Sequence, residues 1–303
     1  MIIFAICIGA GLACQSAVNA KLRTYVLSPF TASMISFFVG AIAITILTFL
    51  SGYVFWEEWG NISGQPLWIF TGGFLGVFSL TMNVILFPIL GGIQAAVLPI
   101  FGQIIMGTLL DQFGWAHTPL QPLTIVKSVG LLLVLIGVLF ATDTFALKQT
   151  IGKSNIGWKL LGILAGMFGA LQAPVNGRLG TVMDSPLLAS QISFYVGLMT
   201  LFIVVLITKS PIKSVKNALQ VGWKSSWIFI GGLLGAAYVF GAAMIAPIIG
   251  TGQLVILTVF GQLVGSVLID KFGFFGAMKK EVTKGKIIGL FVMLVGVIVI
   301  KLI

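Results

Sequence analysis

Long apolar runs recur along the whole chain and are separated by shorter stretches that hold most of its charged residues. An α-helix needs about 20 apolar residues to cross a hydrocarbon core about 30 Å thick. Ten runs come close to that length, near residues 2–20, 30–51, 67–87, 93–112, 123–142, 158–176, 187–208, 226–246, 252–271 and 286–303. We therefore predict an all-α polytopic membrane protein with ten transmembrane helices.

Composition supports this class and excludes a soluble domain. Of the 303 residues, 58% are hydrophobic and 8% are charged, whereas a soluble globular domain has about 25% charged residues. The first apolar run has no basic residues before it and no small-residue cleavage site after it. We expect it to remain in the mature protein rather than to be removed as a secretory signal.

The sequence contains an internal repeat. QSAVNAKL at residues 15–22 returns as QAPVNGRL at residues 172–179. Further matches join Ser28-Pro29 to Ser185-Pro186, Ser36-Phe37 to Ser193-Phe194, Trp68-Ile69-Phe70 to Trp227-Ile228-Phe229, and Phe101-Gly102-Gln103 to Phe260-Gly261-Gln262. The repeat predicts two five-helix units, residues 1–145 and 146–303. Because five is odd, the second unit enters the membrane from the opposite side, which gives two inverted five-helix repeats.

Basic residues predict the orientation. With the N-terminus outside, all but three of the 17 Lys and Arg residues fall in cytoplasmic loops. The exceptions are Lys127, Arg178 and Lys301. The positive-inside rule therefore predicts that both termini lie outside a cytoplasmic membrane. The formal charge of +10 serves orientation among membrane lipids, and we expect no nucleic-acid partner.

Three motifs recur in order in both halves: Q-x-x-x-N-x-[KR], then S-P, then S-F-x-x-G. In these motifs the chain resembles the YdcZ-like family of the drug/metabolite transporter superfamily in its fused two-domain form, over essentially its whole length. The resemblance implies a ten-helix, EamA-like bundle with alternating access. Small multidrug members of that superfamily bind cations and protons through a carboxylate in the first helix. This chain has no acidic residue in its first or sixth apolar run, which departs from that pattern.

Buried amides are the candidate substrate-binding residues. Amides inside a membrane need partners, so they either join helices or face a cavity. Residues at positions i and i+4 share a helix face, so each Gln/Asn pair of the repeated motif points one way. Midplane amides are the stronger candidates, because secondary transporters hold solutes near the midplane. The candidates are Gln103 and Gln262 near the midplane, Gln15, Asn19 and Gln94 toward the inner side, and Gln172, Asn176 and Gln253 toward the outer side.

The same amides could instead have purely structural roles. Asn19 and Asn176 could cap the C-terminal ends of the first and sixth helices. The glutamines could tie helices together rather than bind a solute. The sequence does not decide between these roles and solute binding.

The remaining chemistry favours a secondary transporter for a small organic metabolite or drug-like solute. The seven acidic residues fall at helix ends or in loops, so no intramembrane nucleophile and base pair up as an enzyme would need. One His and two Cys form no metal-ligand spacing, and we expect no cofactor. A membrane channel is the alternative, and an intramembrane enzyme is less favoured. Because the two repeats are fused, we expect a functional monomer.

One charged pair also recurs. Asp111 and Lys127 have the same spacing as Asp270 and Lys286. An Asp at the C-terminal end of a helix is disfavoured by the helix dipole, so each Asp needs compensation. We predict that each Asp forms an ion pair with its Lys and closes the hairpin between two helices.

Overall fold

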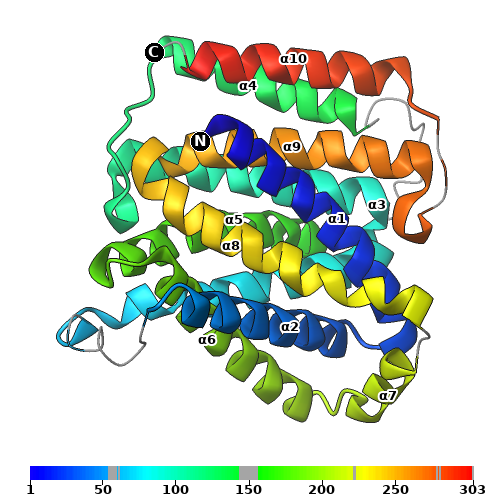
Figure 1. The fold of residues 1–303 in the computed structure, drawn as a ribbon. Coiled ribbons are helices and arrows are strands. Elements are labelled where there is room, and N and C mark those ends of the chain that lie inside the picture. The colour runs from blue at the N-terminus through cyan, green and yellow to red at the C-terminus, as the bar shows by residue number, and fades with distance from the viewer. Residues whose placement is uncertain are drawn as a thin grey trace.

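The protein is described by a computed structural model that covers residues 1–53, 60, 62–142, 156–220, 223–277, 279 and 281–301, without the side chains of residues 87, 88, 91–95, 223–225 and 301. Every regular element in these residues is helical, and the helices pack into one bundle in which α1 and α8 slant relative to α9 and α10 (Figure 1). They are α1 (Ile2–Val26), α2 (Pro29–Leu50), α3 (Gly72–Phe113), α4 (Ile125–Ala141), α5 (Ile156–Val182), α6 (Pro186–Ile207), α7 (Val215–Leu219), α8 (Ile230–Ile249), α9 (Thr251–Phe272) and α10 (Lys284–Lys301).

Membrane-spanning character is confirmed. In the described residues, seven helical segments are long and apolar enough to cross a membrane, and two shorter apolar helices cover 72–86 and 125–141. The chain is therefore a multi-pass membrane protein. The predicted boundary at residues 145 and 146 lies outside the described residues.

The repeated S-P motif starts a helix in both halves. The Ser28 hydroxyl accepts a hydrogen bond from the Thr31 N–H, and the Ser185 hydroxyl accepts one from the Leu188 N–H, each 3.3 Å long. The proline after each serine fills the first helical position, where the N–H that proline lacks would have no partner. The sequence motif is thus a helix start signal.

The element α3 holds both the third and the fourth predicted spans. Leu86 and Leu98 lie beside the same residue of α5, with Leu98 Cβ 3.1 Å and Leu86 Cδ1 3.5 Å from where a Gly162 Cβ would be. Twelve residues of straight helix would separate them by about 18 Å. The two parts of α3 therefore run in opposite directions along α5, as two successive spans require.

Two helices are longer than predicted. We expected the first to end near residue 20 and the sixth near residue 176, but α1 continues to Val26 and α5 to Val182. Asn19, Gln172 and Asn176 of the repeated motif are buried inside these helices and do not end them. The end of α1 comes at Leu27, which adopts a left-handed conformation with φ 58°.

Contacts between loops define the two ends of the bundle. At one end the Ser214 hydroxyl donates to the Val26 carbonyl at 2.7 Å, and the Trp227 and Phe275 rings lie 5.6 Å apart. We call this the basic end, because α1 ends there with Lys21 and Arg23 and the lysine-rich 209–216 segment lies there. At the opposite end, the Trp68 and His117 rings stack 6.1 Å apart. In Figure 1 the basic end, with α7, is on the right.

Glycines allow the two sequence halves to pack closely. In the α4–α10 pair, Gly137 faces the backbone of Gly289 and Met293, while Gly130 faces Gly296. A Cβ at Gly137 would lie 2.7 Å from the Gly289 carbonyl oxygen, closer than any real contact. Close backbone approach is the usual way in which helices associate in lipid, where no hydrophobic drive acts between them.

We predict that Gly137→Ala destabilises the protein, because the added methyl group must push α10 away from α4. Overpacking of this kind costs about 1–3 kcal/mol, more than the gain of at most about 1 kcal/mol from replacing a helical glycine. Thermal unfolding in detergent measures the effect. The matched control is Gly11→Ala, since the nearest atom there, Leu234 Cδ2, is 3.8 Å away. A melting temperature equal to or above that of the control would contradict the prediction.

Candidate functional site

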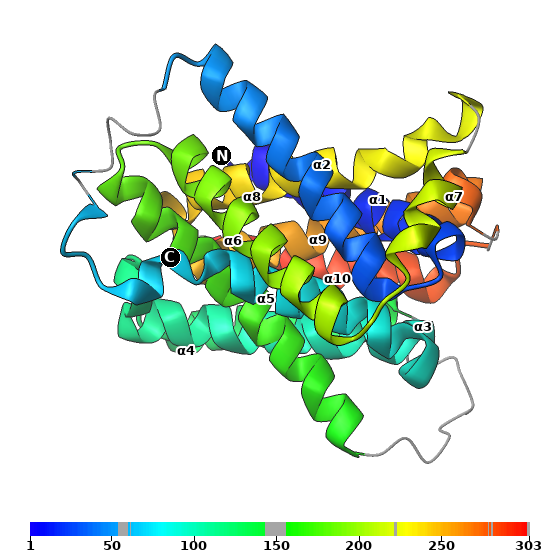
Figure 2. The same ribbon diagram turned by 90° about the horizontal axis from the view of Figure 1, so that it is seen from below.

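A polar cavity lies at the centre of the bundle. Its volume is about 110 Å³, and seven helices line it: α1, α2, α3, α5, α6, α8 and α9. Four of the predicted glutamines meet there, Gln15 from α1, Gln103 from α3, Gln172 from α5 and Gln262 from α9. Figure 2 shows how these helices gather when seen from below, and Figure 1 shows α4 and α10 together along one edge of the bundle. The structure therefore brings together the matched pairs Gln103/Gln262 and Gln15/Gln172 in one cavity, although the sequence placed Gln15 and Gln172 toward opposite sides of the membrane.

These four amides make no hydrogen bond to any residue that the structure describes. Gln191 behaves differently, because its amide nitrogen donates to the Tyr195 hydroxyl at 2.9 Å and so joins side chains of the membrane interior. Two of the four cavity amides rest against glycines of the other half: Gln15 against Gly235 and Gln172 against Gly76. Polar groups of this kind remain available to a solute or to water.

The matched asparagines do not line the cavity. Asn19 is 3% exposed and Asn176 is 1% exposed, and both amide atoms of each lack a hydrogen-bond partner in the described residues. The Asn19 oxygen lies against Gly231, and the Asn176 oxygen against Gly72. Carbonyl oxygens form weak contacts with Cα hydrogens in such positions. The interpretation of these residues as helix caps is wrong, because α1 and α5 continue for about two further turns.

Gln253, from the last predicted pair, lies away from the cavity. Gln253 is in the first turn of α9, where its amide nitrogen donates to the Gln121 side-chain oxygen at 3.3 Å. The side chain of Gln94, its counterpart in the repeat, lies outside the described residues. Gln253 therefore belongs to a contact at the opposite end of the bundle.

Other lining residues break the symmetry of the repeat. Asn83 and Tyr238 both face the cavity, and the repeat pairs them with Ala242 and Ser79. The Asn83 side-chain oxygen is buried and has no partner in the described part of the chain. In the sequence, Asn83 and Tyr238 are notable only because their repeat partners are different residue types. Such a difference does not by itself indicate a cavity.

The S-F-x-x-G motif forms one wall of the cavity. Phe37 of α2 and Phe194 of α6 lie with ring centroids 5.2 Å apart. Phe37 packs on Gly197 and Phe194 packs on Gly40, so each ring uses the glycine of the other half's motif. An apolar groove of about 590 Å³ lies between α2 and α6, and its lining includes Phe38 and Tyr195, the residues that follow the two rings in the sequence.

The cavity is closed more tightly toward one end. On α1, Ser16 and Ala20 are exposed, whereas their repeat partners on α5, Ala173 and Gly177, are buried. Gly177 packs directly on α8, where its Cβ would lie 2.9 Å from Pro247 Cγ. Packing is therefore tighter on the α5 side, and the matched α1 positions stay exposed.

One long side chain crosses the open side. A proline cannot donate the helical hydrogen bond to the carbonyl four residues before it, and Pro88 follows Val84 at that spacing. The Arg23 guanidinium donates to the Val84 carbonyl at 2.8 Å instead. In the other half, Gly177 packs against Ala243, the residue that the repeat matches to Val84. An arginine therefore bridges a gap that direct helix packing fills at the other end.

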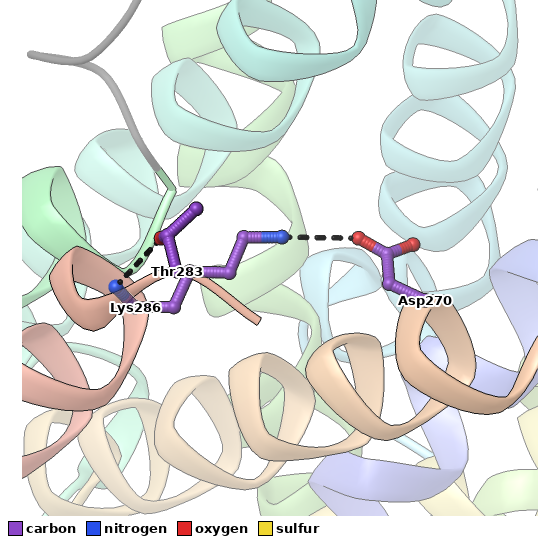
Figure 3. Close-up of polar contacts among 3 residues, drawn as sticks. All are labelled: Asp270, Thr283 and Lys286. Carbon is purple, nitrogen blue, oxygen red and sulfur yellow. Dashed lines mark hydrogen bonds and ion pairs between the residues drawn. The ribbon is translucent and has the colours of Figure 1, made fainter. Parts of the chain in front are cut away.

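One of the two predicted ion pairs is present. The Lys286 ammonium lies 3.2 Å from the Asp270 carboxylate, and the Lys286 N–H donates to the Thr283 hydroxyl at 3.2 Å (Figure 3). The predicted Asp111–Lys127 pair is wrong. Asp111 instead accepts hydrogen bonds from the Thr251 N–H at 2.8 Å and the Gly252 N–H at 2.9 Å. The positive end of the α9 dipole supplies the compensation that this carboxylate needs.

Comparisons with known proteins agree with this fold. One solved structure, titled "Crystal structure of protein", aligns with a TM-score of 0.69 at 16% sequence identity and covers 98% of each chain. At that identity the likeness concerns the fold alone. No curated protein matches the chain.

A family model gives the identity. The model described as "Putative inner membrane exporter, YdcZ" matches residues 1–140 and 157–299, which is nearly the whole chain. The chain therefore belongs to the YdcZ family of the drug/metabolite transporter superfamily, a family of membrane transporters.

Proposed function

We propose that this protein is a secondary transporter that moves a small organic metabolite or drug-like solute across the cytoplasmic membrane. Two inverted five-helix repeats would provide alternating access, with the solute held in the central cavity. One observation carries the proposal: four glutamines from two matched pairs converge on one cavity without hydrogen-bond partners in the described chain. Amides placed in this way inside a membrane are costly unless a solute or water satisfies them.

The unequal closure of the two ends supports alternating access. Matched positions on α1 and α5 are exposed in one half and buried in the other. A structure built from two inverted repeats can exchange these roles, since each half can adopt the arrangement of the other. We interpret the described arrangement as open toward the basic end, with the basic end in the cytoplasm and both termini outside. The fused repeats would work as a monomer.

We predict that Gln103→Leu and Gln262→Leu each reduce transport about tenfold, the effect of losing roughly 1.4 kcal/mol of hydrogen bonding to the solute. Solutes are first selected by the rise they cause in the melting temperature of the purified protein. Counterflow in proteoliposomes then measures exchange, which a channel does not perform.

The control for these variants is Gln191→Leu, whose amide bonds the Tyr195 hydroxyl outside the cavity and which should retain transport. Equal transport in all three variants would remove the proposed site. If the two cavity variants lose transport and also melt at a lower temperature, Gln103 and Gln262 would instead be assigned to helix packing.

The distribution of Lys and Arg residues between the loops predicts the membrane orientation. In a variant with Cys7→Ser and Cys14→Ser, a single Ser63→Cys should react with a membrane-impermeant maleimide added to intact cells. A single Lys213→Cys should react only after permeabilisation. Both side chains are exposed and lie at opposite ends of the bundle. The reverse pattern would place the basic end outside.

A further inference from the structure

The cavity lining also carries information about the charge of the solute. We propose that the solute is small, uncharged, and rich in both hydrogen-bond donors and acceptors, an inference that rests on the function proposed above. No side chain that lines the cavity in the described residues belongs to Asp, Glu, Lys, Arg or His. An ion held there would have no opposite charge beside it, and burial of an unpaired ion is far more costly than burial of a neutral polar group.

The polar groups of the lining fit such a solute. Each glutamine amide can both donate and accept, and Ser16, Ser36 and Ser79 add hydroxyl groups that do the same. The buried Asn83 oxygen is an acceptor without a partner in the described chain, so it calls for an O–H or N–H on the solute. A hydroxylated or amide-bearing molecule can satisfy all of these groups at once.

The basic residues at the end of α1 do not add charge to the cavity lining. Lys21 and Arg23 lie at the basic end of α1 and do not line the cavity. The Arg23 guanidinium already donates to the Val84 carbonyl. An anion in the cavity would therefore be separated from these cations, and a cation would be repelled as it passes them.

Matched compounds that differ only in charge test the proposal. The purified full-length protein is heated with nicotinamide or nicotinate, and with glucose, glucosamine or glucuronate. An uncharged member should raise the melting temperature with an apparent Kd at least tenfold below that of its charged partner. This rise should disappear in the Gln103→Leu/Gln262→Leu double variant.

Two results would overturn the charge assignment: a charged member that stabilises as well as its neutral partner in a glutamine-dependent way, or no stabilisation by any uncharged member. The first result, accompanied by counterflow of that charged solute, leaves the transporter function in place. Failure of the proposed function itself would appear separately, as the absence of counterflow of every stabilising solute in proteoliposomes with the wild-type protein.

A second inference concerns Asp111 and has a different basis. We infer that Asp111 is a latch that holds the opposite end of the bundle closed during alternating access. It lies in the last turn of α3, is 6% exposed, and accepts both hydrogen bonds from the first residues of α9. Gln121 strengthens the same contact, because its amide nitrogen donates to the Ile249 carbonyl at 3.0 Å.

The matched carboxylate in the second half is held differently. The Asp270 side chain is 29% exposed, and its ion pair is with a lysine at the start of α10. A partly exposed ion pair contributes little, whereas two charge-assisted bonds from a helix N-terminus are strong. Asp111 therefore joins the two sequence halves at the closed end, while Asp270 joins only helices of its own half.

Cysteine reactivity in detergent tests the latch. In the Cys7→Ser/Cys14→Ser protein, a Ser16→Cys reporter should react quickly with maleimide and an Ala173→Cys reporter slowly. Adding Asp111→Asn should speed the Ala173→Cys reaction several-fold and slow the Ser16→Cys reaction. Adding Asp270→Asn, the matched control, should not speed the Ala173→Cys reaction.

A second variant keeps the test decisive if Asp111→Asn unfolds, which would appear as faster labelling of both reporters. Gln121→Leu leaves the carboxylate in place and should shift the two rates in the same opposite directions by a smaller factor. If the Ala173→Cys rate is unchanged in Gln121→Leu and in a folded Asp111→Asn, the latch is wrong. That result leaves the transport proposal standing, because these rates are measured without a solute.

Discussion

Close backbone approach between the two sequence halves is the constraint on which the rest of this structure depends. Helices surrounded by lipid gain no hydrophobic free energy by meeting each other, so packing at short range must hold them together. Glycines allow the helix backbones to approach that closely, because they have no side chain. Gly9 meets the Thr258 carbonyl and Gly166 meets the Pro99 carbonyl, contacts that the sequence repeat relates to each other. The helices that carry the cavity glutamines are held by these contacts.

Glycine packing also determines where the amides can lie. A glutamine or asparagine that rests on a glycine occupies the space of the missing side chain, as Gln15 does on Gly235 and Asn19 does on Gly231. The two amides share one face of α1 but differ in surroundings. Asn19 is sealed between helices, while Gln15 reaches the cavity. Depth along a single helix face therefore separates a residue that packs from one that can bind.

Much of this could be predicted from the sequence because it depends on local patterns. Apolar runs predicted the helices, and the S-P motif, recognised in the sequence only as a mark of the repeat, is a local helix start signal in the structure. The i, i+4 spacing of Gln15 and Asn19 predicted that both side chains lie on one helix face. It could not predict which residues that face contacts, because Gly231 and Gly235 come from the other half of the chain. The same limit explains Asp111. The basic residue nearest to it in the sequence is Lys127, but its hydrogen-bond partners are two backbone N–H groups 140 and 141 residues away.

The pairing of Phe37 with Gly197 and of Phe194 with Gly40 has a consequence for how such a sequence can change. After a gene duplication, two copies are usually free to diverge. Here each copy supplies the empty space that the other copy's ring must occupy, so neither the phenylalanine nor the glycine of one copy can be exchanged alone. Positions outside this pairing have diverged freely, among them the cavity-facing Asn83 and Tyr238, whose counterparts are Ala242 and Ser79. The packing that joins the copies thus makes a change in one motif depend on a change in the other.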